Sequence, residues 1–179
     1  MEGLEGIEVS TVILLRGRPG VGKTAVSNKL AIKLDVPIVR KDDLYDVLAG
    51  AVEGHELRNR LAYGMLHRIL ESNAANGSRL ILDFPFNRED DMVRFAAWLS
   101  ARGIVLKPVL CICSDERLWA ERFNVRCLNP APNQLITDFE ALKKHYGDLA
   151  IRPLEDELVV DTVQTLESIV DRIMAFVEN

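Results

Sequence analysis

The sequence lacks the features of a membrane protein or an exported one. Its 179 residues contain no apolar run approaching the roughly 20 residues that a membrane-spanning helix needs. The stretch from Met1 to Ser10 is acidic and has neither the basic start nor the apolar centre of a signal peptide. We therefore expect a cytoplasmic protein with no membrane partner.

Positive charge is not in excess either. The chain has 22 Lys and Arg residues against 27 Asp and Glu residues, which gives a formal net charge of −5. Such a chain offers no bulk attraction to the phosphate backbone of nucleic acids. We therefore do not expect a nucleic-acid partner.

Cysteine and histidine are scarce and show no metal-binding spacing. The three cysteines are Cys111, Cys113 and Cys127, an odd number that matches no zinc pattern. Cys111 and Cys113 share one face of an expected strand, and we interpret all three as small apolar side chains in a reducing compartment. The histidines have no partner spacing for metal binding or nucleophilic catalysis, and we interpret all of them as structural or exposed: His55, His67 and His145.

One stretch organises the rest of the chain. Residues 17–24 read G-x-x-x-x-G-K-T, the phosphate-binding P-loop, between an expected strand at 11–15 and an expected helix at 25–34. Glycines let successive backbone N–H groups point at phosphate oxygens, and the helix N-terminus adds partial positive charge. Lys23 is expected to reach the β- and γ-phosphates, and Thr24 to bind Mg²⁺. The expected nucleotide-binding residues are Gly17, Arg18, Pro19, Gly20, Val21, Gly22, Lys23, Thr24 and Ala25.

Short apolar strands alternate with helical patterns along the whole chain. The hydrophobic spacing predicts strands at 11–15, 36–40, 79–83, 105–113 and 158–162, and helices at 25–34, 43–52, 55–73, 90–101, 116–126, 137–146 and 166–177. No connection is a two-residue hairpin turn, so the pattern predicts an α/β fold with parallel strands and helices on both faces. We see no linker, and expect residues 1–179 to form a single domain with a loose tail at 1–9 and a short lid at about 117–132. The ligand of such a sheet lies beyond the carboxyl ends of its strands.

Aspartates stand at two of those strand ends. Asp83 ends an apolar strand, where a carboxylate can hold the Mg²⁺ of a bound nucleotide; the alternative is a capping or turn residue. Asp42 and Asp43 follow the strand at 36–40, and one of them is a candidate base for a phosphoryl acceptor. The alternative there is a polar strand end that begins a helix.

Arginines cluster on the helix expected at 116–126. Arg122 and Arg126 are four residues apart and therefore share a face, from which they can cover a transferring phosphoryl group. The alternative is a solvated basic face, and Arg117 is the weaker candidate. Arg18 and Arg40 are further candidates for phosphate contacts.

Taken together, these motifs resemble the adenylate-kinase-like P-loop kinases over about residues 10–178. The likeness is strongest to the branch with polynucleotide 5′-hydroxyl kinase, chloramphenicol phosphotransferase and zeta toxins, through the P-loop, Arg40-Lys41-Asp42-Asp43-Leu44, Leu80-Ile81-Leu82-Asp83 and the arginine helix. The resemblance implies a three-layer P-loop NTPase fold with sheet order 2-3-1-4-5. It also implies ATP and Mg²⁺ as cofactors, Asp42 as the base, and Arg122 with Arg126 as lid arginines.

The sequence also departs from that branch. Polynucleotide kinases place a phosphate-binding arginine shortly after the aspartates, where this chain has Leu44-Tyr45-Asp46. We therefore expect a kinase that phosphorylates a hydroxyl of a small molecule, with Lys23, Asp42, Arg122 and Arg126 as catalytic residues and the acceptor surface at 44–60. The alternatives are a nucleotide-hydrolysing switch and a polynucleotide 5′-hydroxyl kinase. The guanine-specific N-K-x-D motif of many switches is absent from any strand end.

Overall fold

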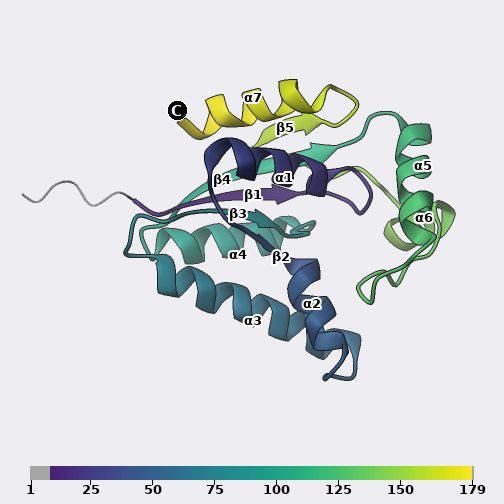
Figure 1. Cartoon of the computed structure of the whole chain (residues 1–179), viewed down its shortest axis with the longest axis horizontal. Coiled ribbons are helices and arrows are strands. Elements are labelled where there is room, and N and C mark those ends of the chain that lie inside the picture. The colour runs from purple at the N-terminus through teal and green to yellow at the C-terminus, as the bar shows by residue number, and fades with distance from the viewer. Residues whose placement is uncertain (1–8, 179) are drawn as a thin grey trace, which may run out of the picture.

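The chain folds around a five-stranded parallel sheet in the order β2-β3-β1-β4-β5 (Figure 1). This computed structural model describes residues 9–178, so the loose tail expected at 1–9 lies, apart from Val9, outside the described residues. The predicted α/β class and strand order are confirmed. The strands are β1 (Thr11–Arg16), β2 (Ile38–Arg40), β3 (Arg79–Asp83), β4 (Val105–Ile112) and β5 (Leu158–Asp161).

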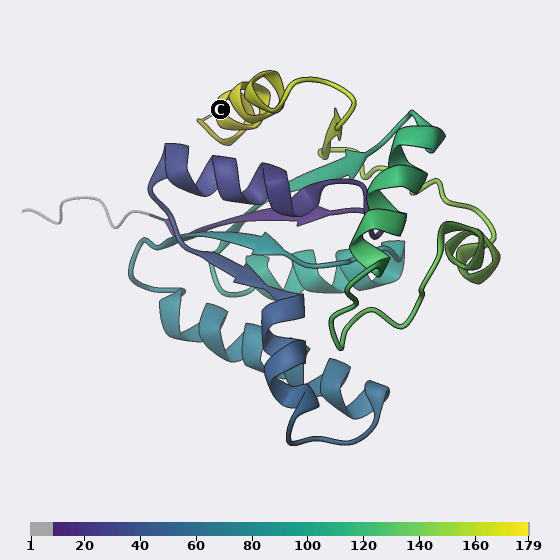
Figure 2. The ribbon, with the colours of Figure 1, turned by 45° about the vertical axis from the view of Figure 1, so that its right-hand side comes forward.

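Helices cover both faces of the sheet and make the fold three-layered. α1 (Lys23–Leu34) and α7 (Leu166–Glu178) pack on one face, and α3 (His55–Asn73) and α4 (Glu89–Ser100) pack on the other. Three more helices lie beyond the carboxyl ends of the strands: α2 (Lys41–Ala49), α5 (Glu116–Cys127) and α6 (Phe139–Tyr146). Figure 2 shows α5 and α6 at the edge of the sheet, with their connecting loop extending toward α2.

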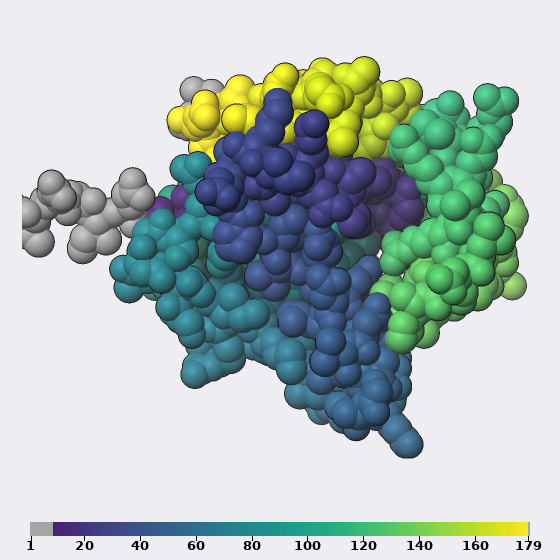
Figure 3. All heavy atoms as spheres, in the orientation of Figure 1, coloured from purple at the N-terminus to yellow at the C-terminus, as the bar shows by residue number. Residues whose placement is uncertain are grey.

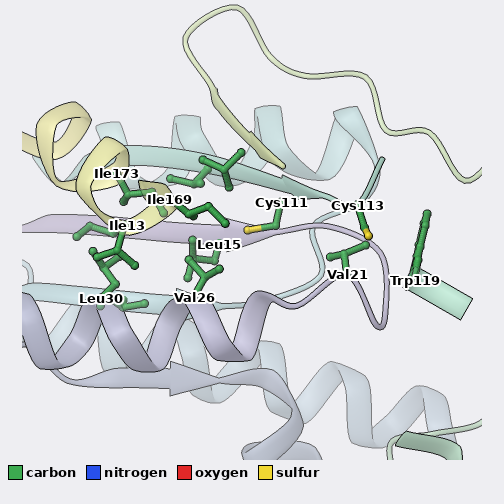
Figure 4. Packing of buried hydrophobic residues seen from close by; sticks show 14 of the residues in the cluster. Ile13, Leu15, Val21, Val26, Leu30, Cys111, Cys113, Trp119, Ile169 and Ile173 are labelled. Carbon is green, nitrogen blue, oxygen red and sulfur yellow. The ribbon is translucent and has the colours of Figure 1, made fainter. Parts of the chain in front are cut away.

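The side chains of the central strand, β1, explain why helices cover both faces of the sheet. Ile13 and Leu15 of β1 face α1 and α7, whereas Val12 and Leu14 face α3 and α4, and at most 1% of each side chain is exposed. A strand that is apolar on both faces reads as a continuous apolar run, as residues 11–15 do. The hydrophobic cluster between the sheet and helices α1 and α7 continues to Val21 of the P-loop and to Trp119 beside it (Figure 4). The P-loop therefore rests directly on the hydrophobic core.

Most predicted elements are confirmed, but several predicted boundaries are wrong: α1 begins at Lys23 rather than at residue 25, β2 at Ile38 rather than at residue 36, and α2 ends at Ala49 rather than at residue 52. The starts of α2 and α6 also differ, and each has a clear physical reason. α2 begins at Lys41 rather than at residue 43, so Asp42 and Asp43 lie in the first turn of a helix instead of at the end of a strand. Negative charge in a first turn is stabilised by the helix dipole, which favours the earlier start. α6 begins at Phe139 rather than at Thr137, because the Asp138 carboxylate caps it by accepting from the Ala141 N–H at 2.7 Å.

The expected burial of Cys111 and Cys113 is confirmed. Both lie in the core cluster beside β1, and burial raises the pKa of the Cys111 thiol to about 12. Cys127 is half-buried, and burial raises the pKa of its thiol as well. Among residues 9–178, no helix is long and apolar enough to span a membrane.

Candidate active site

The P-loop takes a conformation that only its glycines allow. Gly17 has φ 143° and Gly20 has φ 80°, both in the left-handed region that L-residues with a side chain rarely adopt. A Cβ on Gly17 would lie 2.3 Å from the Cys111 carbonyl oxygen, and one on Gly20 would lie 3.0 Å from the Phe123 ring. No side chain caps α1 at Gly22, which leaves the start of this helix open to an anionic ligand.

Neighbouring elements fix the loop from outside. Trp119 on α5 donates its indole N–H to the Pro19 carbonyl at 2.8 Å, and Thr162 after β5 donates its hydroxyl to the Val21 carbonyl at 2.6 Å. The Arg18 guanidinium turns away from the loop interior. It donates to the carbonyls of residues 148–150 and lies 4.0 Å over the Tyr146 ring. The Arg18 side chain therefore holds the segment after α6 in place.

Lys23, Thr24 and Asp83 meet at the carboxyl ends of β1 and β3. Lys23 Nζ donates to the carbonyls of Gly17 and Arg18 at 3.0 and 3.1 Å. Thr24 Oγ1 donates to Asp83 Oδ2 at 3.2 Å. A hydroxyl beside a carboxylate fits the hard oxygen ligands of Mg²⁺, which takes its remaining ligands from phosphates and water. The residues present therefore fit the metal that the motif implies.

The Asp83 carboxyl is held in an unfavourable environment. It is 9% exposed, and burial raises its pKa although the Lys23 ammonium acts in the opposite direction. A carboxyl whose pKa is raised on folding binds its proton more tightly in the folded state. Its ionisation therefore costs stability as the pH rises from the ordinary carboxyl pKa through the shifted one.

Asp83→Asn is accordingly expected to stabilise the ligand-free protein at pH 7. The amide keeps an oxygen for Thr24 and removes the buried charge, and we expect a rise in melting temperature of about 2–4 °C, or about 1 kcal/mol for a domain of this size. Thermal unfolding at pH 7 and at pH 4 measures it, and the difference from wild type should shrink at pH 4. Asp171→Asn on the exposed face of α7 is the control. An unchanged or lower melting temperature at pH 7 would contradict the burial argument.

The two adjacent aspartates of α2 have different surroundings. Asp42 lines a cavity of about 390 Å³ together with Lys23, Thr24 and Asp83, and we call it the main cavity because it holds these four candidate residues. Asp43 is 69% exposed, lies outside this cavity, and is 3.8 Å from Arg40. The structure thus places Asp42, and not Asp43, opposite the P-loop.

A chain of polar contacts joins α2 to α5 and the loop after it. Arg126 Nη2 donates to Asp42 Oδ2 and to Asn133 Oδ1, each at 3.0 Å. Asn133 in turn donates its backbone N–H and side-chain amide to the two carboxylate oxygens of Asp46, at 2.9 and 2.7 Å. In Figure 3 the green spheres of this loop lie beside the blue spheres of α2. We call residues 116–146, which close the cavity on this side, the α5–α6 segment.

Asp46→Ala is expected to loosen this closure without touching Asp42 or Arg126. It removes two charge-assisted hydrogen bonds, each typically contributing about 1.5–3 kcal/mol. Hydrogen exchange of residues 128–138 should then accelerate by at least about tenfold, which corresponds to 1.4 kcal/mol. Asp43→Ala is the matched control, since it removes an aspartate of the same helix that does not contact the loop. Equal exchange in both variants and wild type would show that Asp46 does not hold the segment.

The two arginines that the sequence paired have different hydrogen-bond partners in the structure, although both line a second cavity. Arg122 donates to the hydroxyl and carbonyl of Thr162 at 3.1 and 3.2 Å and does not contact Asp42. This second cavity of about 430 Å³ lies beside Gly20 and Gly22 of the P-loop. Arg126 borders both cavities, and Arg117 is exposed and borders neither.

The sequence model of the AAA domain family, AAA_33, matches residues 12–143, which contain the P-loop, Asp42, Asp83 and Arg126. The chain belongs to this AAA domain family. No curated protein matches the sequence.

Solved structures that resemble this AAA domain protein include several described as kinases. A candidate kinase from Chloroflexus aurantiacus has a TM-score of 0.78 at 22% identity, over 94% of this chain and 98% of the other. The APS kinase CysC of Mycobacterium tuberculosis has a TM-score of 0.68 at 14% identity, over 96% and 99%. A gluconokinase from Sinorhizobium meliloti has a TM-score of 0.60 at 17% identity, over 96% and 93%. At these identities the likeness shows a shared fold, that of P-loop kinases.

Two histidines also line the main cavity. His55 lies within the acceptor surface expected at 44–60, whereas His145 was missed, since the spacing of the histidines suggested only structural or exposed roles. His55 Nδ1 lies 2.9 Å from the Tyr45 hydroxyl, and its Nε2 lies 2.7 Å from Asn59 Nδ2. Burial and the nearby Lys41 ammonium lower the pKa of His55, which favours its neutral ring. No sequence signal placed His145 of α6 at this site.

Proposed function

We propose that this AAA domain protein is an ATP-dependent kinase that transfers the γ-phosphate to a hydroxyl group of a small molecule. One observation carries the proposal: the main cavity is lined by the phosphate- and Mg²⁺-binding groups Lys23, Thr24 and Asp83 and, across from them, by the Asp42 carboxylate. A nucleotide-hydrolysing switch has no need of a carboxylate on an acceptor side. The P-loop kinase fold of the structural neighbours supports the same reading.

The nucleotide would be held by backbone and side chains together. The N–H groups of the P-loop, except at Pro19, would surround the phosphates, and Lys23 would exchange its two loop carbonyls for phosphate oxygens. Thr24 and Asp83 would hold Mg²⁺, which offsets the negative charge of the phosphates when bound. We propose that the second cavity takes the nucleoside, with Arg122 at its wall.

In the transfer step, the acceptor hydroxyl lies between Asp42 and the γ-phosphate. Its oxygen forms a bond to the γ-phosphorus while the bond from that phosphorus to the β–γ bridging oxygen breaks, which releases ADP. The hydroxyl proton passes to the Asp42 carboxylate. Asp42 Oδ2 already accepts from Arg126, whereas Oδ1 has no hydrogen-bond partner within residues 9–178 and is free for this proton. Arg126 then neutralises charge on the transferring group.

A panel of acceptors tests the proposal. ATP consumption with Mg²⁺ is measured with nucleosides, nucleoside monophosphates, sugars, sugar acids, aminoglycosides, chloramphenicol and 5′-hydroxyl oligonucleotides. We expect a small-molecule class to raise turnover at least about tenfold over the acceptor-free rate. A response to oligonucleotides alone would instead identify a polynucleotide kinase. Slow ATP consumption that no acceptor changes would overturn the proposed kinase function and favour a nucleotide-hydrolysing switch.

A further inference from the structure

Lys41 is a buried cation without a direct ion pair. It is 8% exposed and lines the main cavity. Within residues 9–178 its ammonium makes no hydrogen bond or ion pair, and its Nζ lies 4.3 Å from the centroid of the Tyr45 ring. Burial lowers the pKa of Lys41, although the charges of Asp42 and Asp46 act in the opposite direction. A buried charge without a hydrogen-bonded partner is costly, so the ammonium is available to an anionic ligand.

The position of Lys41 assigns that anion to the acceptor rather than to ATP. Lys41 directly precedes Asp42 and stacks on Tyr45, whose hydroxyl contacts His55. It does not line the second cavity, where Arg122 and the P-loop glycines lie. Two other charged groups of the main cavity are already engaged, Asp42 with Arg126 at 3.0 Å and Lys23 with the loop carbonyls at 3.0 and 3.1 Å, whereas Arg40 lies 3.8 Å from Asp43 and leaves its Nε without a partner.

Three further buried polar atoms on the same walls have no partner. They are Arg40 Nε, Asn59 Oδ1 and Asn87 Oδ1, and all three residues line the main cavity. In the described part of the chain, one other buried side-chain atom is unpartnered, on His67, which is outside this cavity. Buried polar groups normally have partners. Their concentration here indicates a ligand with several polar groups.

The size of the cavity limits that ligand. About 390 Å³ is near the lower end of small-molecule sites, and the part beside Lys23 is needed for the γ-phosphate. The remaining space suits a molecule of roughly monosaccharide size.

From these contacts we infer that the acceptor is a small polyhydroxylated molecule that carries its own anionic group, a carboxylate or a phosphate. Lys41 and Arg40 bind the anion, and the amides of Asn59 and Asn87 bind hydroxyls that orient the reacting one toward Asp42. The inference rests on the proposed kinase function for the identity of the acceptor. The anion site itself does not depend on turnover.

The first experiment measures the anion site directly. Sulfate is titrated by calorimetry into protein saturated with Mg²⁺ and a non-hydrolysable ATP analogue, so that the P-loop is already filled. We expect saturable binding to wild type and at least about tenfold weaker binding to Lys41→Met, whose side chain is of similar length and removes only the charge. Lys29→Met, which removes an exposed α1 lysine paired with Glu167 at 3.3 Å, is the control and should bind as wild type does. Absence of saturable binding to wild type, or equal binding to Lys41→Met, would overturn the inference.

The second experiment compares acceptors that differ in charge. Turnover is measured with glucose and gluconate, ribose and ribose 5-phosphate, and glycerol and glycerol 3-phosphate. We expect the anionic member of a pair to have at least about tenfold higher kcat/KM, and Lys41→Met to raise its KM while the KM for ATP stays unchanged. If the neutral acceptors worked equally well, the inference of an anionic acceptor would be wrong, but the proposed kinase function would stand. Sulfate binding without turnover of any acceptor would instead retain the anion site and reject the kinase.

Discussion

Asp42→Asn is expected to lower kcat with the best acceptor by about 10²–10⁴-fold, the usual contribution of a positioned general base. Asparagine keeps an oxygen for the 3.0 Å contact from Arg126 but cannot take the proton of the acceptor hydroxyl. The P-loop is untouched, so the affinity for ATP should change by less than about threefold. Steady-state kinetics and calorimetric titration of the ATP analogue measure the two effects separately.

The neighbouring aspartate supplies the control for this result. Asp43→Asn makes the same chemical change one residue away, on an exposed side chain that does not line the cavity. It should keep nearly all of the wild-type kcat. Full turnover in Asp42→Asn, or an equal loss in both variants, would remove Asp42 from the role of base.

Lys23→Ala is expected to weaken ATP binding and transfer together. The ammonium now donates to two carbonyls of the loop, and we propose that it moves to the β- and γ-phosphates when the nucleotide binds. Removing one preorganised charge from a transition state typically lowers kcat by about 10²–10³-fold, and the loss of phosphate contacts should also lower the affinity for ATP by at least about tenfold. Calorimetry with the ATP analogue and single-turnover kinetics measure both losses.

A lysine of the same helix tests whether this effect is specific. Lys29→Ala removes an exposed α1 lysine that pairs with Glu167 on α7 and lines neither cavity. It should leave both measurements near wild type. If Lys23→Ala bound ATP with unchanged affinity, the P-loop role of Lys23 would be wrong. Together, the variants of Asp42 and Lys23 separate acceptor activation from nucleotide binding.

The parts of the fold that sequence reasoning predicted well are those governed by local patterns. β3 and α3 have their predicted bounds, because a continuous apolar run fits a buried strand and apolar residues at helical spacing, such as the buried Leu66 and Leu70, fit a helix. The P-loop was equally readable, since its glycines, its lysine and its flanking strand and helix are contiguous. Asp83 was predicted in the same way, as the last residue of an apolar run. In the structure its strand pairs with β1, and Leu15 lies opposite Asp83.

Other features depended on packing between segments far apart in the chain. The contact of Arg126 with Asp42 spans 84 residues, and that of Asn133 with Asp46 spans 87. The spacing of Arg122 and Arg126 correctly placed both on one helix, but it gave no information on how that helix docks. The structure directs Arg126 to Asp42 and Arg122 to Thr162.

The sequence alone thus indicated a P-loop nucleotide site on a parallel α/β sheet, because that information lies in contiguous residue types and in their periodicity. It did not indicate which polar groups share a cavity. Lys41 reads as an ordinary charged residue before two aspartates, and only the packing of α2 and α3 makes it a buried cation in the main cavity without a direct ion pair. Burial and pairing are properties of the surroundings in three dimensions, and they give the same side chain a solvated surface role in one place and a ligand-binding role in another.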